Sequence, residues 1–119
     1  MPSVEPLDSA ALDALLDATG GDPAFLAEMI DSFLVDADEQ FAAIDTALAG
    51  GVAGDVRRAA HSLKSNSATF GALHLAETCR QIEELAKSEE LGAIPALAAL
   101  ARSQFAGVKD HLLITRAEL

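Results

Sequence analysis

Residues 22–51 read DPAFLAEMIDSFLVDADEQFAAIDTALAGG and carry the clearest helical signal in the chain. Asp22 suits a helix N-cap, Pro23 suits the first helical position, and Gly50-Gly51 provides a stop. Between them the apolar residues recur at steps of three and four, at Phe25, Leu26, Met29, Ile30, Phe33, Leu34, Phe41, Ile44 and Leu48. This spacing predicts one amphipathic helix of about 27 residues, roughly 40 Å long.

Four further helices are predicted around it. Leu7-Asp8-Ser9 begins a short helix that Gly20-Gly21 ends, and two more helices cover about 52–70 and 72–87. After a break at 91–95, Pro95 or its neighbours open the last helix. The sequence shows no strand alternation, repeat or low-complexity linker. Because short connections favour antiparallel neighbours, we expect an all-α, up-down-up-down four-helix bundle.

Composition supports one helical domain over residues 1–119, since half of the residues are hydrophobic and 25 are alanine and 17 leucine. The net charge of −11 is uneven: residues 1–56 hold 12 acids and no Lys or Arg, whereas 57–119 hold 7 acids and all 8 bases. So acidic a chain repels phosphate backbones and anionic lipid, which argues against nucleic acid or a membrane as main partner.

The N-terminus and the cysteine content favour a cytoplasmic protein. Residues 1–5 lack the basic start and apolar run of a signal peptide, and Cys79 has no second cysteine to pair with. The apolar run at 91–101 is too short to span a bilayer and contains Pro95. An initiating Met1 and a length that matches one domain favour a free-standing protein.

Motifs of common enzymes and cofactor sites are missing from the sequence. No two histidines are spaced i, i+4, and no glutamate stands three residues before a histidine, so a metal-carboxylate bundle enzyme is disfavoured and no metal is expected. There is no phosphate-binding glycine loop, no G-x-S-x-G and no basic-aromatic surface. We expect His74 and His111 to be surface or partly buried residues, and Cys79 to be a small core residue.

His61 differs from the other histidines in its surroundings. The apolar stripe of its helix, formed by Val56, Ala60, Leu63, Ser67 and Phe70, is centred about 200° away from it on a helical wheel. Within about 60° of His61 lie only cationic and small side chains: Arg57, Arg58, Lys64, Ser65 and Ala68. Nearby cations favour a neutral imidazole with a nucleophilic nitrogen and stabilise a phosphoryl group on it. The alternative is an ordinary histidine on a solvated face.

Residues 60–72, AHSLKSNSATFGA, resemble the sequence signature of histidine-containing phosphotransfer (HPt) domains, which is roughly A-H-x-L-K-G-x-S-x-x-x-G-A. Residues 73–85 and 20–26 also resemble the family, so the likeness spans nearly the whole chain. It implies a four-helix bundle at about 22–118 with an accessory helix at about 7–19. It also implies a role as a relay in multistep two-component phosphorelays.

The resemblance also implies roles for individual residues. His61 would be the phosphoacceptor, and Lys64 the cation that steadies the phosphoryl group. Ser65 stands where the family usually has the glycine that leaves room for the partner. Ser67 matches a small polar position, and Gly71 matches the end of the helix.

Glu83 matches a position where the family often has Gln or Glu reaching the histidine. A carboxylate that accepts the Nδ1 proton would leave Nε2 free to attack. Glutamate also occurs there in phosphoacceptor domains of chemotaxis-type kinases, which leaves the kind of donor open. The alternative is an ordinary solvated carboxylate.

The expected partners are response-regulator receiver domains and a hybrid histidine kinase. Transfer would run from a receiver aspartate to His61 and on to another receiver, and the receiver would supply Mg²⁺. The chain would then be a phosphoryl carrier without cofactor or kinase activity, and a monomer. Acidic receivers would dock on a surface formed by Arg57, Arg58, Ser65, Ala68 and Arg80. The competing hypothesis is a non-catalytic docking or inhibitory module.

Overall fold

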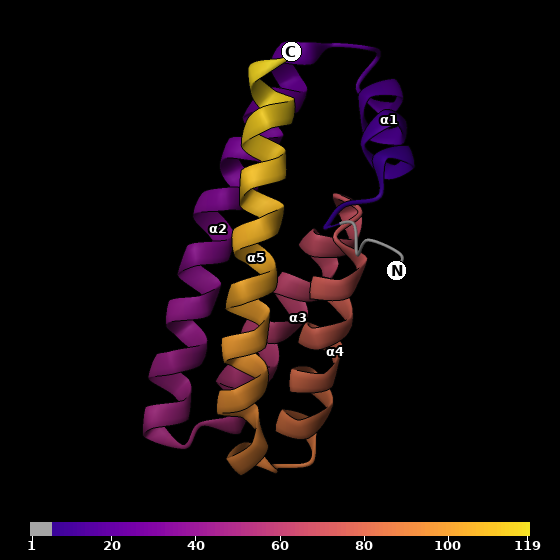
Figure 1. Cartoon of the computed structure of the whole chain (residues 1–119). Helices are drawn as coiled ribbons and strands as arrows, with labels where there is room; N and C mark the ends of the chain where they lie inside the picture. Colours follow the sequence, from indigo (N-terminus) through magenta and orange to yellow (C-terminus); the bar gives the residue numbers. More distant parts are fainter. Residues whose placement is uncertain (1–5) are drawn as a thin grey trace.

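The structure is a computed structural model that describes residues 6–119. In this range the chain forms five α-helices and one 3-10 turn and contains no strand, which confirms the all-α prediction (Figure 1). The elements are α1 (Ser9–Ala18), α2 (Pro23–Gly50), α3 (Ala53–Thr69), α4 (Leu73–Lys87), η1 (Leu91–Ala93) and α5 (Ile94–Ala117).

The helix ends form where the capping residues predict them. Asp22 Oδ1 accepts hydrogen bonds from the backbone N–H groups of Ala24 and Phe25, at 3.0 and 3.4 Å, and Pro23 occupies the first turn. Gly51 ends α2 in the left-handed conformation, with φ of +67°. These local signals place the 28 residues of α2 within one residue of the predicted helix at each end.

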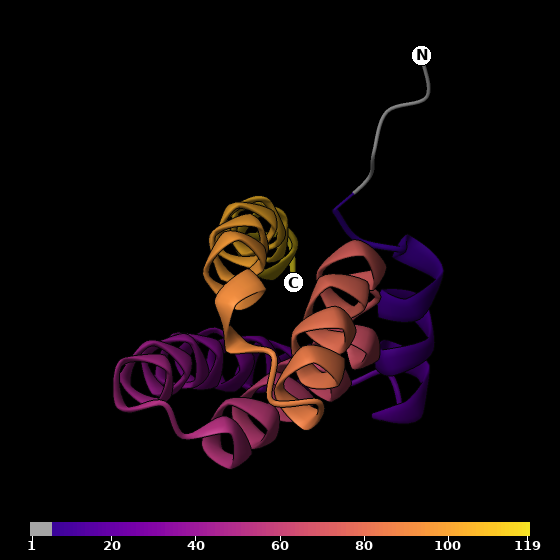
Figure 2. The same cartoon turned by 90° about the horizontal axis from the view of Figure 1, so that it is seen from below.

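The four long helices run alternately down and up, and α2 and α5 extend past the ends of α3 and α4 (Figure 1). Each helix packs against two neighbours in the closed order α2, α3, α4, α5, which is visible along the bundle axis in Figure 2. The antiparallel up-down-up-down bundle is therefore confirmed. Helix α1 stands outside this bundle (Figure 1).

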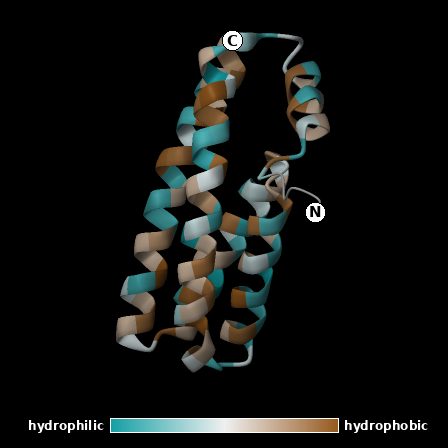
Figure 3. Ribbon diagram, viewed as in Figure 1, coloured by the Kyte–Doolittle hydropathy of each residue, from teal (hydrophilic) through white to brown (hydrophobic). Residues whose placement is uncertain are grey.

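Phenylalanine rings link three of the helices in the core. The Phe33 ring stacks on Phe70 at 4.8 Å between centroids and meets the edge of Phe105 at 6.0 Å. Phe41 lies 5.6 Å from Phe105. Hydrophobic and hydrophilic residues interleave along every bundle helix (Figure 3), as expected where each helix buries one face.

The expectation that Phe25 faces the core is wrong, and two leucines of α5 are exposed as well. Phe25 is half exposed, because the first turns of α2 project past the end of α3 (Figure 1), whereas Leu26 in the same turn is buried. Leu100 and Leu113 are also exposed. They belong to α5, whose main neighbours are α2 and α4 alone, so its apolar stripe is wider than the arc that these two helices cover.

Gly71 joins α1 to the turn between α3 and α4. Its φ is +76°, and a Cβ there would lie 2.7 Å from Ala11 Cβ and 2.8 Å from the Asp8 carbonyl oxygen. The Asp8 N–H donates to the Gly71 carbonyl at 2.8 Å. Gly71 thus ends α3 and also allows close contact with the accessory helix, a second requirement that the sequence did not indicate.

The segment Leu91–Ala117, which comprises η1 and α5, is long and apolar enough by composition to cross a membrane. The sequence interpretation missed this, because it counted only the uncharged run at 91–101. One such helix is weak evidence for a membrane span, since the core helix of a bundle can have the same composition. Here Ala101, Phe105 and Val108 are buried in the bundle core.

Candidate functional site

His61 lies near the middle of α3 and points away from the core. Its neighbours Val56, Ala60 and Leu63 are buried, whereas 59% of the His61 side chain is exposed. The core-facing stripe therefore fixes the helix so that the imidazole faces solvent, as the helical wheel predicts.

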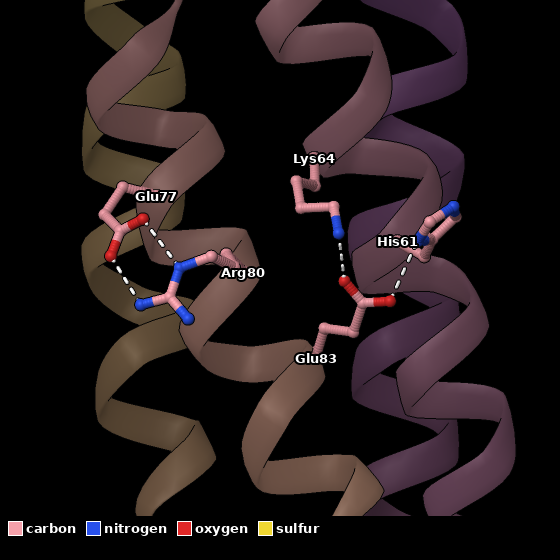
Figure 4. Close-up of polar contacts among 5 residues, drawn as sticks. All are labelled: His61, Lys64, Glu77, Arg80 and Glu83. Atoms are coloured by element: carbon pink, nitrogen blue, oxygen red, sulfur yellow. Dashed lines mark hydrogen bonds and ion pairs between the residues drawn. The ribbon is translucent and has the colours of Figure 1, made fainter.

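Glu83 of α4 lies between His61 and Lys64 of α3. One carboxylate oxygen, Oε2, is 2.8 Å from His61 Nδ1, and the other, Oε1, accepts a hydrogen bond from Lys64 Nζ at 2.5 Å (Figure 4). Only 12% of the Glu83 side chain is exposed. Its neighbour Ile82 and Ala86 one turn later are buried, and this packing sets the rotation of α4 that turns Glu83 toward α3.

The Glu83 carboxylate is ionised at neutral pH. Partial burial raises the pKa of this carboxyl, but hydrogen bonds from Lys64 and His61 outweigh burial and hold the pKa below its ordinary value. An ionised carboxylate can only accept, so the contact assigns the ring proton to Nδ1. In the neutral ring, Nε2 then carries the lone pair, and no described residue forms a hydrogen bond with it. The arrangement presents a nucleophilic nitrogen to solvent.

The cations expected to surround His61 are mostly paired with carboxylates. Arg58 pairs with Asp55 on its own helix. Arg80 binds Glu77 through two hydrogen bonds of 2.8 and 2.7 Å, away from the imidazole (Figure 4).

Lys64 is paired with Glu83. Arg57 makes no ion pair within residues 6–119. The surface around His61 is thus less positive than predicted. A helical wheel of residues 53–69 alone does not include the Glu83 carboxylate, which comes from α4.

The small residues of the motif occupy different environments. Ser65 and Ala68 are exposed on α3, one and two turns after His61. Their side chains are small, so they leave space beside the ring. Ser67 is fully buried, and its hydroxyl oxygen has no hydrogen-bond partner among the described residues. Ser67 therefore contributes to packing between the helices rather than to the surface around the imidazole.

Sequence reasoning missed a contact between α2 and α3 next to this surface. Asn66 Nδ2 donates to Asp36 Oδ2 at 2.9 Å, and Gln40 Nε2 donates to Asp36 Oδ1 at 3.4 Å. Asn66 stands within the motif, but its partner is 30 residues earlier in the chain, and no local pattern connects the two. The contact fixes α3 against α2 two residues beyond Lys64.

The remaining candidate residues are not part of this cluster. His74 is exposed at the start of α4, and His111 is partly buried on α5. Cys79 is fully buried, and burial raises the pKa of its thiol to about 12, which excludes a thiolate nucleophile at neutral pH. Within residues 6–119 no three His, Cys, Asp or Glu side chains are grouped so that they could hold a metal ion.

A four-helix bundle that exposes one imidazole, hydrogen-bonded to a carboxylate, from the middle of a helix is the arrangement that the resemblance at 60–72 implies. Residues 28–113 match the Hpt domain family, and the chain belongs to this family. Membership assigns it to histidine phosphotransfer in phosphorelays.

Two solved structures agree with this assignment. Histidine-containing phosphotransfer protein B (HptB) from Pseudomonas aeruginosa PAO1 has a TM-score of 0.90 and 31% identity, over 98% of this chain and 99% of that one. The maize histidine-containing phosphotransfer protein ZmHP2 has a TM-score of 0.79 and 25% identity, over 95% and 88%. A search of curated protein sequences finds no match.

Proposed function

We propose that His61 is the phosphoacceptor, and that it takes a phosphoryl group from a receiver-domain aspartate and passes it to another receiver. The observation that carries this proposal is the 2.8 Å contact between His61 Nδ1 and Glu83 Oε2, which in the neutral ring places the lone pair on Nε2. His61 is also the histidine of the stretch at 60–72 that resembles the family signature.

The chemistry is two displacements at phosphorus. In the first, the Nε2 lone pair attacks the phosphorus of an aspartyl phosphate, and the P–O bond breaks with its electron pair going to the aspartate oxygen. In the second, an acceptor aspartate attacks the same phosphorus, and the P–N bond breaks with its pair returning to Nε2. The family resemblance gives Lys64 the role of supplying positive charge for the phosphoryl oxygens; in the free protein its Nζ binds Glu83 Oε1 at 2.5 Å.

The chain acts as a carrier in this scheme. The receiver supplies Mg²⁺, and this protein needs no cofactor and has no kinase activity of its own. Receivers dock on the exposed part of α3 and α4 around His61, where Arg57, Ser65 and Ala68 are solvent-accessible. We expect a cytoplasmic monomer of one domain, charged by a hybrid histidine kinase through its receiver.

The test is transfer from a receiver charged with labelled acetyl phosphate in the presence of Mg²⁺. We expect an acid-labile, base-stable label on the protein, which His61→Gln abolishes and His74→Gln retains. His74 is the matched control because it is an exposed histidine outside the cluster. Absence of label on the wild type would favour a non-catalytic docking or inhibitory module.

Glu83 favours a second candidate, a phosphoacceptor domain for a chemotaxis-type kinase, because the resemblance connects glutamate at this position with such domains. The phosphoryl donor that labels the protein distinguishes the two candidate functions. Label that appears with such a kinase and ATP, and does not appear with charged receivers, would support the second candidate. Label that appears only with charged receivers supports the phosphorelay carrier.

A further inference from the structure

The Glu83 carboxylate is placed to act on the phosphorylated ring as well as on the free one. Its Oε2 atom approaches Nδ1, the nitrogen that keeps its proton when Nε2 carries a phosphoryl group. Since Nε2 is on the opposite side of the ring from this contact, phosphorylation leaves the Nδ1–Glu83 hydrogen bond in place. The carboxylate therefore remains next to a ring that has become cationic.

The leaving group in the second transfer depends on this proton. If Nδ1 is protonated when the P–N bond breaks, the electron pair returns to a cationic ring and yields neutral imidazole. If Nδ1 has lost its proton, the same step must expel an imidazolide anion, a far poorer leaving group. Retention of the proton makes both transfers possible without any proton leaving or entering the ring.

We propose that Glu83 is a positioning residue whose negative charge keeps Nδ1 of phosphorylated His61 protonated, and so keeps the phosphoryl group ready for transfer at neutral and mildly alkaline pH. This inference rests on the proposed function of His61. The cation at Lys64 supports it, because Lys64 Nζ binds the other carboxylate oxygen at 2.5 Å and keeps Glu83 ionised.

The other charged groups on nearby turns of the helices around His61 do not replace Glu83. They are Arg57, Arg58 and Lys64 on α3, Arg80 and Glu84 on α4, and Asp36 on α2. The three α3 cations disfavour a positive ring, and Arg80 is bound by Glu77. Asp36 is engaged by Asn66. Among the described residues, Glu83 alone brings a negative charge into hydrogen-bond contact with the imidazole.

The decisive variant is Glu83→Gln. A glutamine oxygen still accepts the Nδ1 proton, so the ring keeps its orientation, while the negative charge and the acceptor for Lys64 Nζ are lost. Glu84→Gln is the matched control, because it makes the same change on the adjacent, exposed residue. Phosphoramidate, a small phosphoryl donor, charges the full-length wild type and both variants without a receiver.

The measurement is the rate of phosphoryl loss from His61, to a receiver with Mg²⁺ and separately to water, between pH 5.5 and 8.5. We expect the wild-type rate divided by the Glu83→Gln rate to be near one at pH 5.5. It should rise to about tenfold at pH 8.5, because an adjacent opposite charge shifts a titration by about one pH unit or more. The ratio for Glu84→Gln should stay near one.

A wild-type to Glu83→Gln ratio that is constant with pH would overturn the inference and leave Glu83 with an orienting role only. Any effect of pH on the receiver changes the wild-type and variant rates equally, so it does not change their ratio. Loss to water gives the same test without any receiver. Failure of the proposed function is distinguishable, because phosphohistidine would then form with phosphoramidate and no receiver would accept its phosphoryl group.

Discussion

Two glutamates on α4, Glu83 and Glu77, make ion pairs of similar length in different surroundings. Glu77 pairs with Arg80 on its own helix, and about half of each side chain is exposed. Glu83 is 12% exposed and joins two residues of the neighbouring helix. Short distances alone therefore do not identify a functional carboxylate. Shelter from water and contacts across helices distinguish Glu83, because charges interact more strongly where less water screens them.

The largest difference between these two glutamates should appear in phosphotransfer. Glu83→Ala removes the acceptor for Nδ1, so the ring loses its fixed orientation, and Lys64 loses its partner. We expect the rate of transfer from a charged receiver to fall by about 10- to 100-fold, comparable to the loss when the partner that orients a metal-binding histidine is removed. Glu77→Ala should change the rate by less than about twofold. Rapid-quench measurements of the labelled protein check both values, and equal effects would contradict the distinction.

Stability at low pH and high salt should separate the two glutamates further. The pKa of both carboxyls is held below its ordinary value, Glu83 by Lys64 and His61 against the opposing effect of burial, and Glu77 mainly by the hydrogen bond from Arg80. A lowered pKa means that each ionised carboxylate stabilises the fold above the unfolded-state value of about 4.3, and that this contribution is lost as the pH falls through the folded-state value.

We therefore expect Glu83→Gln to lower the thermal midpoint at pH 7, with the difference from wild type shrinking as the pH falls below the unfolded-state value of about 4.3. Adding 1 M salt at pH 7 should leave most of this difference in thermal midpoint, because the Lys64–Glu83 pair is largely shielded from water. Any effect of Glu77→Gln should be smaller and should vanish in salt. Thermal unfolding followed by circular dichroism checks both, and a Glu83→Gln effect that disappears in salt would show that this pair is as well solvated as the other.

The sequence predicted the helix ends and the exposure of His61 better than it predicted the ion pairs of the site. The ends of α2 follow from Asp22, Pro23 and Gly51, since caps and stops act within one turn. The exposure of His61 follows from helical periodicity, which needs no knowledge of the neighbouring helices. The resemblance pointed to Glu83, and the structure places it in contact with the imidazole.

Other contacts could not be read from the sequence, because they depend on how separate helices are rotated and offset. Asp36 meets Asn66 only because α2 and α3 pack in a particular register. Ala11 approaches Gly71 only because α1 folds back onto the turn after α3. Phe25 fits the apolar periodicity of α2 and is exposed, because periodicity gives the face of a helix and not the length over which another helix covers it.

The smallest expected effect concerns the rate of encounter with a receiver. Arg57 is exposed and has no ion-pair partner in residues 6–119, whereas the charge of Arg80 is offset by Glu77. We expect Arg57→Ala to lower the second-order rate constant of transfer by about threefold at low salt, because an unpaired surface charge attracts an acidic partner over a longer range than a paired one. Arg80→Ala should have a smaller effect. At about 0.5 M salt both variants should match wild type, since screening removes long-range attraction. If Arg80→Ala slows transfer as much as Arg57→Ala, its guanidinium contacts the receiver directly, and pairing with Glu77 does not exclude it from the docking surface.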